Sequence, residues 1–221
     1  MERHSSQINI RMLAVLVCVA ASLASLVPSL AGASLIVAPH GDGELISVAD
    51  PRMPAEFLGV LKGYPHTYSF DVSEESDVSI LLRIPQNSPV HDAGMILVRE
   101  ETRGVSEVGR TLAGKAPFSA VREPVTAATF LDAGTIEAQL KQGSYRLEVS
   151  SPSNDASYQL IFNRAPKRSY FENLQYLLLM NGFLKRSPAY LLFSPIIYIP
   201  LLIAGALGLA FYLYVRNRTH A

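Results

Sequence analysis

Two long apolar stretches stand out in the pattern of hydrophobic and polar positions, one near each end of the chain. The first covers residues 12–27 and the second covers residues 189–215. Between them the apolar residues no longer form a run but alternate with polar ones. The pattern therefore predicts a folded central region with a hydrophobic segment on either side.

The alternation in the central region has a period of two residues. Successive side chains of a β-strand point to opposite faces, so this period predicts strands with one buried face. The apolar sets are Tyr68, Phe70 and Val72; Val78, Ile80, Leu82 and Ile84; Tyr145, Leu147 and Val149; and Tyr158, Leu160 and Phe162.

Further strands are predicted at residues 44–48, 57–62, 95–99 and 125–130. Residues 103–122 are the least regular, and we interpret them as one weak strand and a long loop. Pro-, Gly- and Asn-containing turns separate the strands, and no long amphipathic helix lies between them. About eight short strands at this spacing predict a mainly β protein, with an antiparallel β-sandwich or jelly roll over residues 34–164.

The N-terminal apolar stretch has the parts of a secretory signal. Arg3 and Arg11 precede it, Pro28 follows it, and residues 31–33 supply small side chains for cleavage. At about sixteen residues the stretch is short for a membrane span. We therefore predict a cleaved signal peptide over residues 1–33, with an uncleaved N-terminal anchor as the alternative.

The C-terminal stretch is long enough to cross a bilayer. Residues 191–213 carry no charge and would extend about 34 Å as a helix, against a hydrocarbon core of about 30 Å. We expect a transmembrane helix over residues 189–215 and a tail over residues 216–221. Basic residues next to a spanning helix stay preferentially in the cytoplasm, so the tail is predicted to be cytoplasmic. The sandwich is then outside, in the periplasm or at the cell exterior. The predicted interface anchors are Tyr190, Tyr212, Tyr214, Arg216 and Arg218.

Residues 165–188 differ from both neighbours, because an apolar and aromatic segment lies between two basic ends. The segment is too short to span a membrane. Two main interpretations stay open: an amphipathic helix in the outer membrane interface, or a helix packed on the sandwich. A re-entrant hairpin is a lesser alternative.

Small residues recur four apart in the predicted spanning helix. Such pairs let helix backbones approach closely in lipid, although small residues are frequent in membrane helices anyway. We therefore expect this helix to contact membrane lipid. Its small residues could also pack against a helix of a membrane-protein partner or of a second copy of the chain. The candidate packing residues are Ala204, Gly208, Ala206 and Ala210.

Charge divides the chain. Residues 34–164 contain 11 Lys and Arg against 17 Asp and Glu, a net charge of −6, whereas the other residues carry a net charge of +6. Phosphate contacts need a basic face, so we expect no nucleic-acid partner. The one cysteine, Cys18, lies in the predicted signal, so a cleaved chain has no disulfide or thiolate site.

Candidate chemistry is sparse. Asp42, Glu44 and Asp50 lie near glycines and are weak candidates for calcium ligands, with a plain acidic turn as the alternative. His40, His66 and His91 have no spacing typical of metal ligands. No motif of a nucleophile or phosphate loop occurs, so we expect no cofactor and no catalytic residue.

One stretch resembles a known family. Residues 140–149 (Leu-Lys-Gln-Gly-Ser-Tyr-Arg-Leu-Glu-Val), followed by Ser-Tyr-Gln-Leu at 157–160, resemble the closing hairpin of bacterial pre-peptidase C-terminal domains. Residues 68–72 resemble a Tyr-x-Phe strand of that family, whereas its acidic segment is matched at 92–97 by one acid only. The resemblance implies a jelly-roll accessory domain without an active site, used for binding or folding support.

The sequence predicts a single-pass membrane protein that presents a β-sandwich for a non-catalytic role in binding or assembly. An accessory subunit of a larger membrane complex, associating through its helices, is one alternative. A membrane-tethered hydrolase of the cell envelope is another.

Overall fold

The computed structural model describes residues 35–37, 45–112, 114 and 119–219. The chain divides into two compact units, Met1–Gly32 and Ala33–Ala221, and every described residue belongs to the second. The predicted signal peptide, Asp42, Glu44 and His40 lie outside the described residues.

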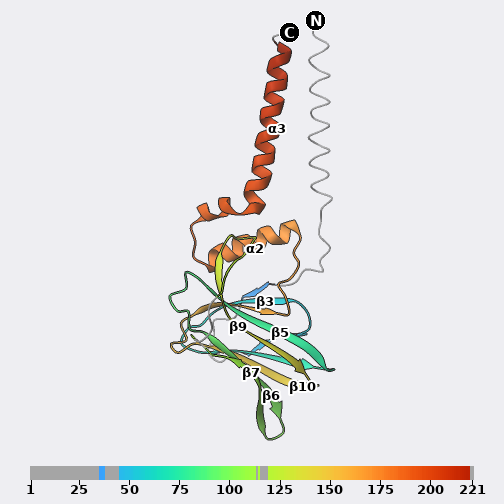
Figure 1. Cartoon of the computed structure of the whole chain (residues 1–221), viewed down its shortest axis with the longest axis vertical. Coiled ribbons are helices and arrows are strands. Elements are labelled where there is room, and N and C mark those ends of the chain that lie inside the picture. Colours follow the sequence, from blue (N-terminus) through green and yellow to red (C-terminus); the bar gives the residue numbers. More distant parts are fainter. Residues whose placement is uncertain (1–34, 38–44, 113, 115–118, 220–221) are drawn as a thin grey trace. The chain divides into compact units, whose positions relative to one another are not determined.

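The strands form two sheets that face each other as a β-sandwich (Figure 1), as the sequence predicts. The six-stranded sheet has the order β1-β3-β11-β5-β9-β8 and the five-stranded sheet has the order β2-β4-β10-β6-β7. Pairing is antiparallel except between β1 and β3 and between β2 and β4. The strands are β1 (Leu35–Val37), β2 (Leu45–Ser47), β3 (Ala55–Val60), β4 (His66–Val72), β5 (Ser76–Pro85), β6 (Gly94–Glu101), β7 (Gly104–Thr111), β8 (Ser119–Arg122), β9 (Thr129–Leu140), β10 (Gly143–Ser150) and β11 (Ser157–Phe162).

The core between the sheets contains the apolar sets that the period of two predicts. Tyr68 and Phe70 of β4 pair across the five-stranded sheet with Leu147 and Tyr145 of β10. The rings of Phe70 and Tyr145 stack, with centroids 5.7 Å apart. Phe57 and Phe162, from the other sheet, make edge contacts with Tyr68 and Phe70, respectively. Aromatic packing across the interior therefore joins the two sheets.

Two strand predictions are wrong in detail. The strand expected at residues 125–130 starts at Thr129 and continues to Leu140 as β9. The irregular region 103–122 contains two strands, β7 and β8, instead of one. Both lie at sheet edges, where most of their side chains are exposed, so they lack an apolar face that a sequence pattern could reveal.

Three helical elements follow the sandwich: α2 (Tyr170–Phe183), the 3₁₀ helix η1 (Pro188–Phe193) and α3 (Pro195–Thr219). The apolar helix begins at Pro195 and not at residue 189, because Ser194 takes an extended conformation before the proline. Helix α3 then runs through Pro200. Its Pro195–Asn217 stretch is long and apolar enough to cross a membrane, and none of its most apolar window is buried.

Candidate functional site

The junction between the sandwich and α2 combines a buried ion pair with an apolar cluster. Helix α2 begins with a capping box: the Ser169 N–H donates to Glu172 Oε2 (2.6 Å) and the Glu172 N–H donates to Ser169 Oγ (3.4 Å). The hydrogen bond from the Ser169 backbone is the main reason that the pKa of Glu172 is lowered. This local sequence fixes where the helix starts.

One side of α2 packs on the outer face of the six-stranded sheet (Figure 1). Tyr176 and Met180 form a buried cluster with Leu58 of β3 and Phe130 of β9. The sequence leaves several interpretations open for residues 165–188. For this side of α2, the interpretation as a helix packed on the sandwich is the one that the structure shows. The cluster comprises Leu58, Ala128, Phe130, Tyr176, Met180 and Leu184.

A buried carboxylate lies at the centre of this junction. Glu56 of β3 is fully buried, and its Oε1 accepts hydrogen bonds from Gln159 Nε2 (2.7 Å) and from Tyr176 Oη (3.0 Å). Its other oxygen, Oε2, pairs with Arg168, which immediately precedes the cap of α2. A buried charge needs such partners, and here sheet and helix both supply them.

Arg168 and Tyr176 also contact each other. The guanidinium carbon lies 3.8 Å from the centroid of the Tyr176 ring, a distance typical of a cation–π contact. Burial, and next the negative charge of Glu56, raises the pKa of Tyr176, so its hydroxyl stays a donor at neutral pH. Glu56 and Arg168 are 112 positions apart, and no sequence signal connects them.

Hydrogen bonds extend this junction to η1 and α3. Asn87 Nδ2 donates to the Leu184 carbonyl (3.1 Å), and Ser194 Oγ donates to the Val125 carbonyl (2.6 Å). Tyr170 Oη, in the first turn of α2, donates to the carbonyl of Ile196 in the first turn of α3 (3.2 Å). The start of the apolar helix is therefore tied both to α2 and to the sandwich.

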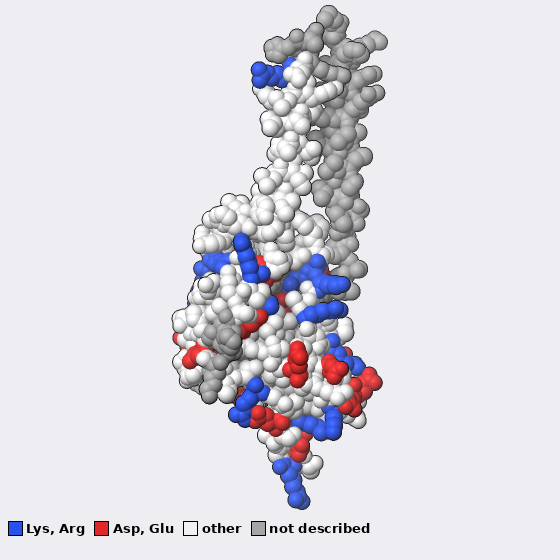
Figure 2. Space-filling view, viewed as in Figure 1, with Lys and Arg blue, Asp and Glu red and all other residues white. Residues whose placement is uncertain are grey.

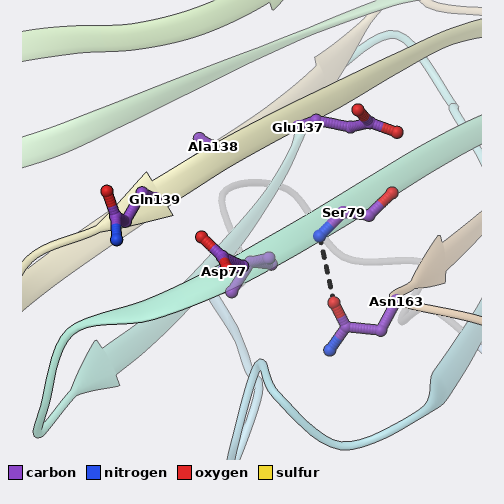
Figure 3. A pocket seen from close by; sticks show the side chains of 7 residues that line it. Asp77, Ser79, Glu137, Ala138, Gln139 and Asn163 are labelled. Atoms are coloured by element: carbon purple, nitrogen blue, oxygen red, sulfur yellow. Dashed lines mark hydrogen bonds between the residues drawn. The ribbon is translucent and has the colours of Figure 1, made fainter.

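A depression of about 430 Å³ lies on the same sheet, over β5 and β9. Figure 3 shows Asp77, Ser79, Glu137 and Gln139 spread along the two strands, with Asn163 beside them. Asn163 Oδ1 accepts a hydrogen bond from the Ser79 N–H (3.0 Å), so this side chain secures the backbone. The depression is open, and the labelled side chains do not converge on one point.

A second depression, of about 320 Å³, lies on the five-stranded sheet. Its polar side chains bind one another: Ser144 Oγ donates to Asp71 Oδ1 (2.6 Å), and Arg146 pairs with Glu100. Such mutual pairs are typical of a solvated sheet face.

Of the three calcium candidates, the structure describes Asp50 alone. Its carboxylate forms an ion pair with Arg52 (3.0 Å), and the hydrogen bond from that guanidinium is the main reason for its lowered pKa. Among the described residues, no group of three His, Cys, Asp or Glu side chains is placed to hold a metal ion. The calcium set stays a prediction, because Asp42 and Glu44 lie outside those residues.

Two of the three histidines are described. His66 Nδ1 lies 2.7 Å from Tyr158 Oη, which lies 2.7 Å from Tyr68 Oη, and all three side chains are buried. Burial raises the pKa of both tyrosines. His91 Nε2 donates to the Gln86 carbonyl (3.1 Å). His66 therefore belongs to a core network, whereas His91 secures a turn.

The predicted membrane residues lie in η1 and α3. Tyr190 is half-exposed in η1 with the Arg186 guanidinium 5.2 Å from its ring, and Tyr212 and Tyr214 are exposed on α3. Arg216 lies near the end of α3, and the side chain of Arg218 is outside the described part. Figure 2 shows Lys and Arg at that end and no charged atoms along the visible face of α3 before it.

The small residues of α3 are all exposed, namely Ala204, Ala206, Gly208 and Ala210. A Cβ added at Gly208 would meet no atom within 4 Å. Association through these residues stays a prediction.

No protein-family model and no curated protein sequence matches the chain. Solved structures with a similar fold include the pre-peptidase C-terminal domain of a collagenase from Bacillus anthracis (14% identity, TM-score 0.37, covering 58% of this chain and 99% of that domain). Another is a periplasmic inhibitor of g-type lysozyme from Aeromonas hydrophila (11% identity, TM-score 0.35, covering 56% and 98%).

Proposed function

We propose that this protein is a membrane-anchored β-sandwich module, held by α3 with the sandwich on the extracytoplasmic side, and that it binds or assembles without catalysing a reaction. The observation that carries the proposal is α3 itself. Its spanning stretch is apolar and unburied, which is unfavourable in water and favourable in lipid.

The orientation follows from the predicted N-terminal signal and from the charge after α3, while Lys185 and Arg186 on the sandwich side run against the charge bias. Arg216 and Arg218 follow the apolar stretch, and basic residues next to a spanning helix stay preferentially in the cytoplasm. The sandwich, which precedes α3, then lies on the opposite side of the bilayer.

The polar surfaces support a role in binding or assembly. The described depressions on the two sheets are open, and several polar side chains of the one on the five-stranded sheet already bind one another. Such surfaces suit contact with a macromolecule better than closure around a small reacting molecule.

Protease protection tests the anchor and its orientation together. The full chain, with a tag at its C-terminus, is expressed in bacteria whose outer membrane has been permeabilised, and protease is then added. We expect the chain to sediment with membranes after alkaline extraction, the sandwich to be digested and the tag to survive until the inner membrane is lysed. Release by alkali would contradict the anchor, and loss of the tag with survival of the sandwich would contradict the orientation.

A further inference from the structure

Helix α2 has a second apolar side that the sandwich does not cover. While Tyr176, Leu177 and Met180 are buried, Leu178 is 56% exposed and Phe171 is 42% exposed. Apolar residues on both sides of a helix indicate that both sides have an apolar neighbour.

Basic residues flank this exposed side. Lys167 precedes α2 and Lys185 follows it, and both are exposed. Glu172 is the one acidic residue between positions 164 and 187, and its carboxylate accepts the Ser169 N–H in the capping box. The ends of the helix are therefore suited to an anionic surface.

The exposed side of α2 continues towards the predicted membrane span. Leu192 and Phe193 of η1 are 60% and 65% exposed, and η1 leads directly into α3. The Tyr170 hydroxyl binds the Ile196 carbonyl, so the first turn of α2 contacts the first turn of α3. If α3 enters the bilayer, the start of α2 lies at the bilayer surface.

We propose that the exposed side of α2, together with η1, lies in the headgroup and upper acyl region of an anionic phospholipid bilayer. Helix α2 then has two apolar contacts, the six-stranded sheet on one side and lipid on the other. This inference rests on the proposed function, because it needs α3 in the membrane. A phospholipid surface fits better than a protein, because basic ends, half-exposed Tyr170 and Tyr190 and continuity with α3 are typical of interfacial helices.

Single-tryptophan fluorescence tests this contact, because the chain has no tryptophan of its own. The full chain carrying Leu178→Trp is reconstituted into vesicles of phosphatidylcholine and phosphatidylglycerol, with or without bromine on the acyl chains. Val105→Trp is the matched control, because Val105 is 65% exposed on β7 in the sandwich. Leu207→Trp, on α3, reports whether α3 is in the bilayer.

We expect bromine to reduce the Leu178→Trp emission by about twofold, and to leave Val105→Trp unchanged, because an interfacial helix buries its apolar side to the depth of the upper acyl chains. Adding Lys167→Glu and Lys185→Glu to Leu178→Trp should weaken the quenching. Equal quenching with and without these two changes would overturn the role of the basic ends.

The controls separate this inference from the proposed function. If Leu207→Trp is quenched while Leu178→Trp is not, α3 is in the bilayer and the lipid contact of α2 is overturned. A Leu178→Trp emission that is blue-shifted but unquenched would also overturn it, because protein would then cover α2. If Leu207→Trp is unquenched, the membrane anchor itself fails.

Discussion

Glu56 is a charged side chain in an interior position, and its neighbours explain how the fold tolerates it. The carboxylate accepts hydrogen bonds from Gln159 and Tyr176 and pairs with Arg168, whose side chain is 8% exposed. Burying such a pair costs desolvation of both ions, so its stabilising effect relative to apolar residues is small. Removing only one member of the pair has a larger effect, because the other member is then left as an unpaired buried charge.

The variant Glu56→Gln should therefore lower the free energy of unfolding by about 3 kcal/mol, because Arg168 stays buried without its counter-ion. Urea unfolding of the full chain in mild detergent, followed by circular dichroism, measures the change. Glu74→Gln is the control: Glu74 pairs with Arg52, but its side chain is 76% exposed, and we expect a loss under about 1 kcal/mol. Equal losses in the two variants would contradict a special role for Glu56.

At the scale of single elements, α2 shows what an apolar pattern can and cannot predict. The sequence predicts a helix between the sandwich and the span, and the structure has one at Tyr170–Phe183. Because apolar residues occur on both sides of α2, the pattern does not say which side faces the sheet. That choice depends on Leu58 and Phe130, which are far away in the sequence.

The bounds of β9 also differ from the strand that the sequence predicts at residues 125–130, because the two faces of β9 have different neighbours along its length. A bulge interrupts its pairing with β5 opposite Leu82 and Arg83. Phe130, before the bulge, packs under α2, whereas Ala133 and Ile136 face the interior of the sandwich. The period of two changes phase within the strand, so the sequence pattern ends there although the strand continues.

A strand is predictable where its buried apolar residues alternate regularly with polar ones. The apolar residues of β4 and β10 keep one phase throughout, and their predicted sets, like that of β11, are buried. No sequence pattern predicts the contact of Glu56 with Arg168, because this contact forms only when α2 covers the outer face of the six-stranded sheet.

The two sides of α2 should respond differently to truncation. Met180→Ala removes a fully buried side chain under the sheet and should lower the free energy of unfolding by about 2–4 kcal/mol. Leu178→Ala, on the exposed side of the same helix, should change it by less than about 0.5 kcal/mol in detergent. The measurement is again urea unfolding of the full chain. A larger loss for Leu178→Ala would mean that the assignment of the two sides is reversed.

At the scale of the whole molecule, the packing of α2 bears on how far the independently stable unit extends past the sandwich. The pattern ends the sandwich at residue 164, but the outer face of the six-stranded sheet is completed by α2. A fragment of residues 34–164 would leave Leu58 and Phe130, both fully buried in the whole chain, without their cover. The smallest independent unit should therefore extend beyond α2.

Two fragments without α3 test this boundary. We expect residues 34–187 to be soluble and to unfold in one cooperative transition, and residues 34–164 to be less stable by about 3 kcal/mol, because the apolar contact with α2 is lost. The shorter fragment should also aggregate more readily through the uncovered sheet face. Residues 34–187 with Met180→Ala should lie between the two, because this variant weakens the same contact without removing the helix. Equal stability of all three would mean that the sandwich is complete without α2, and that the helix serves the membrane alone.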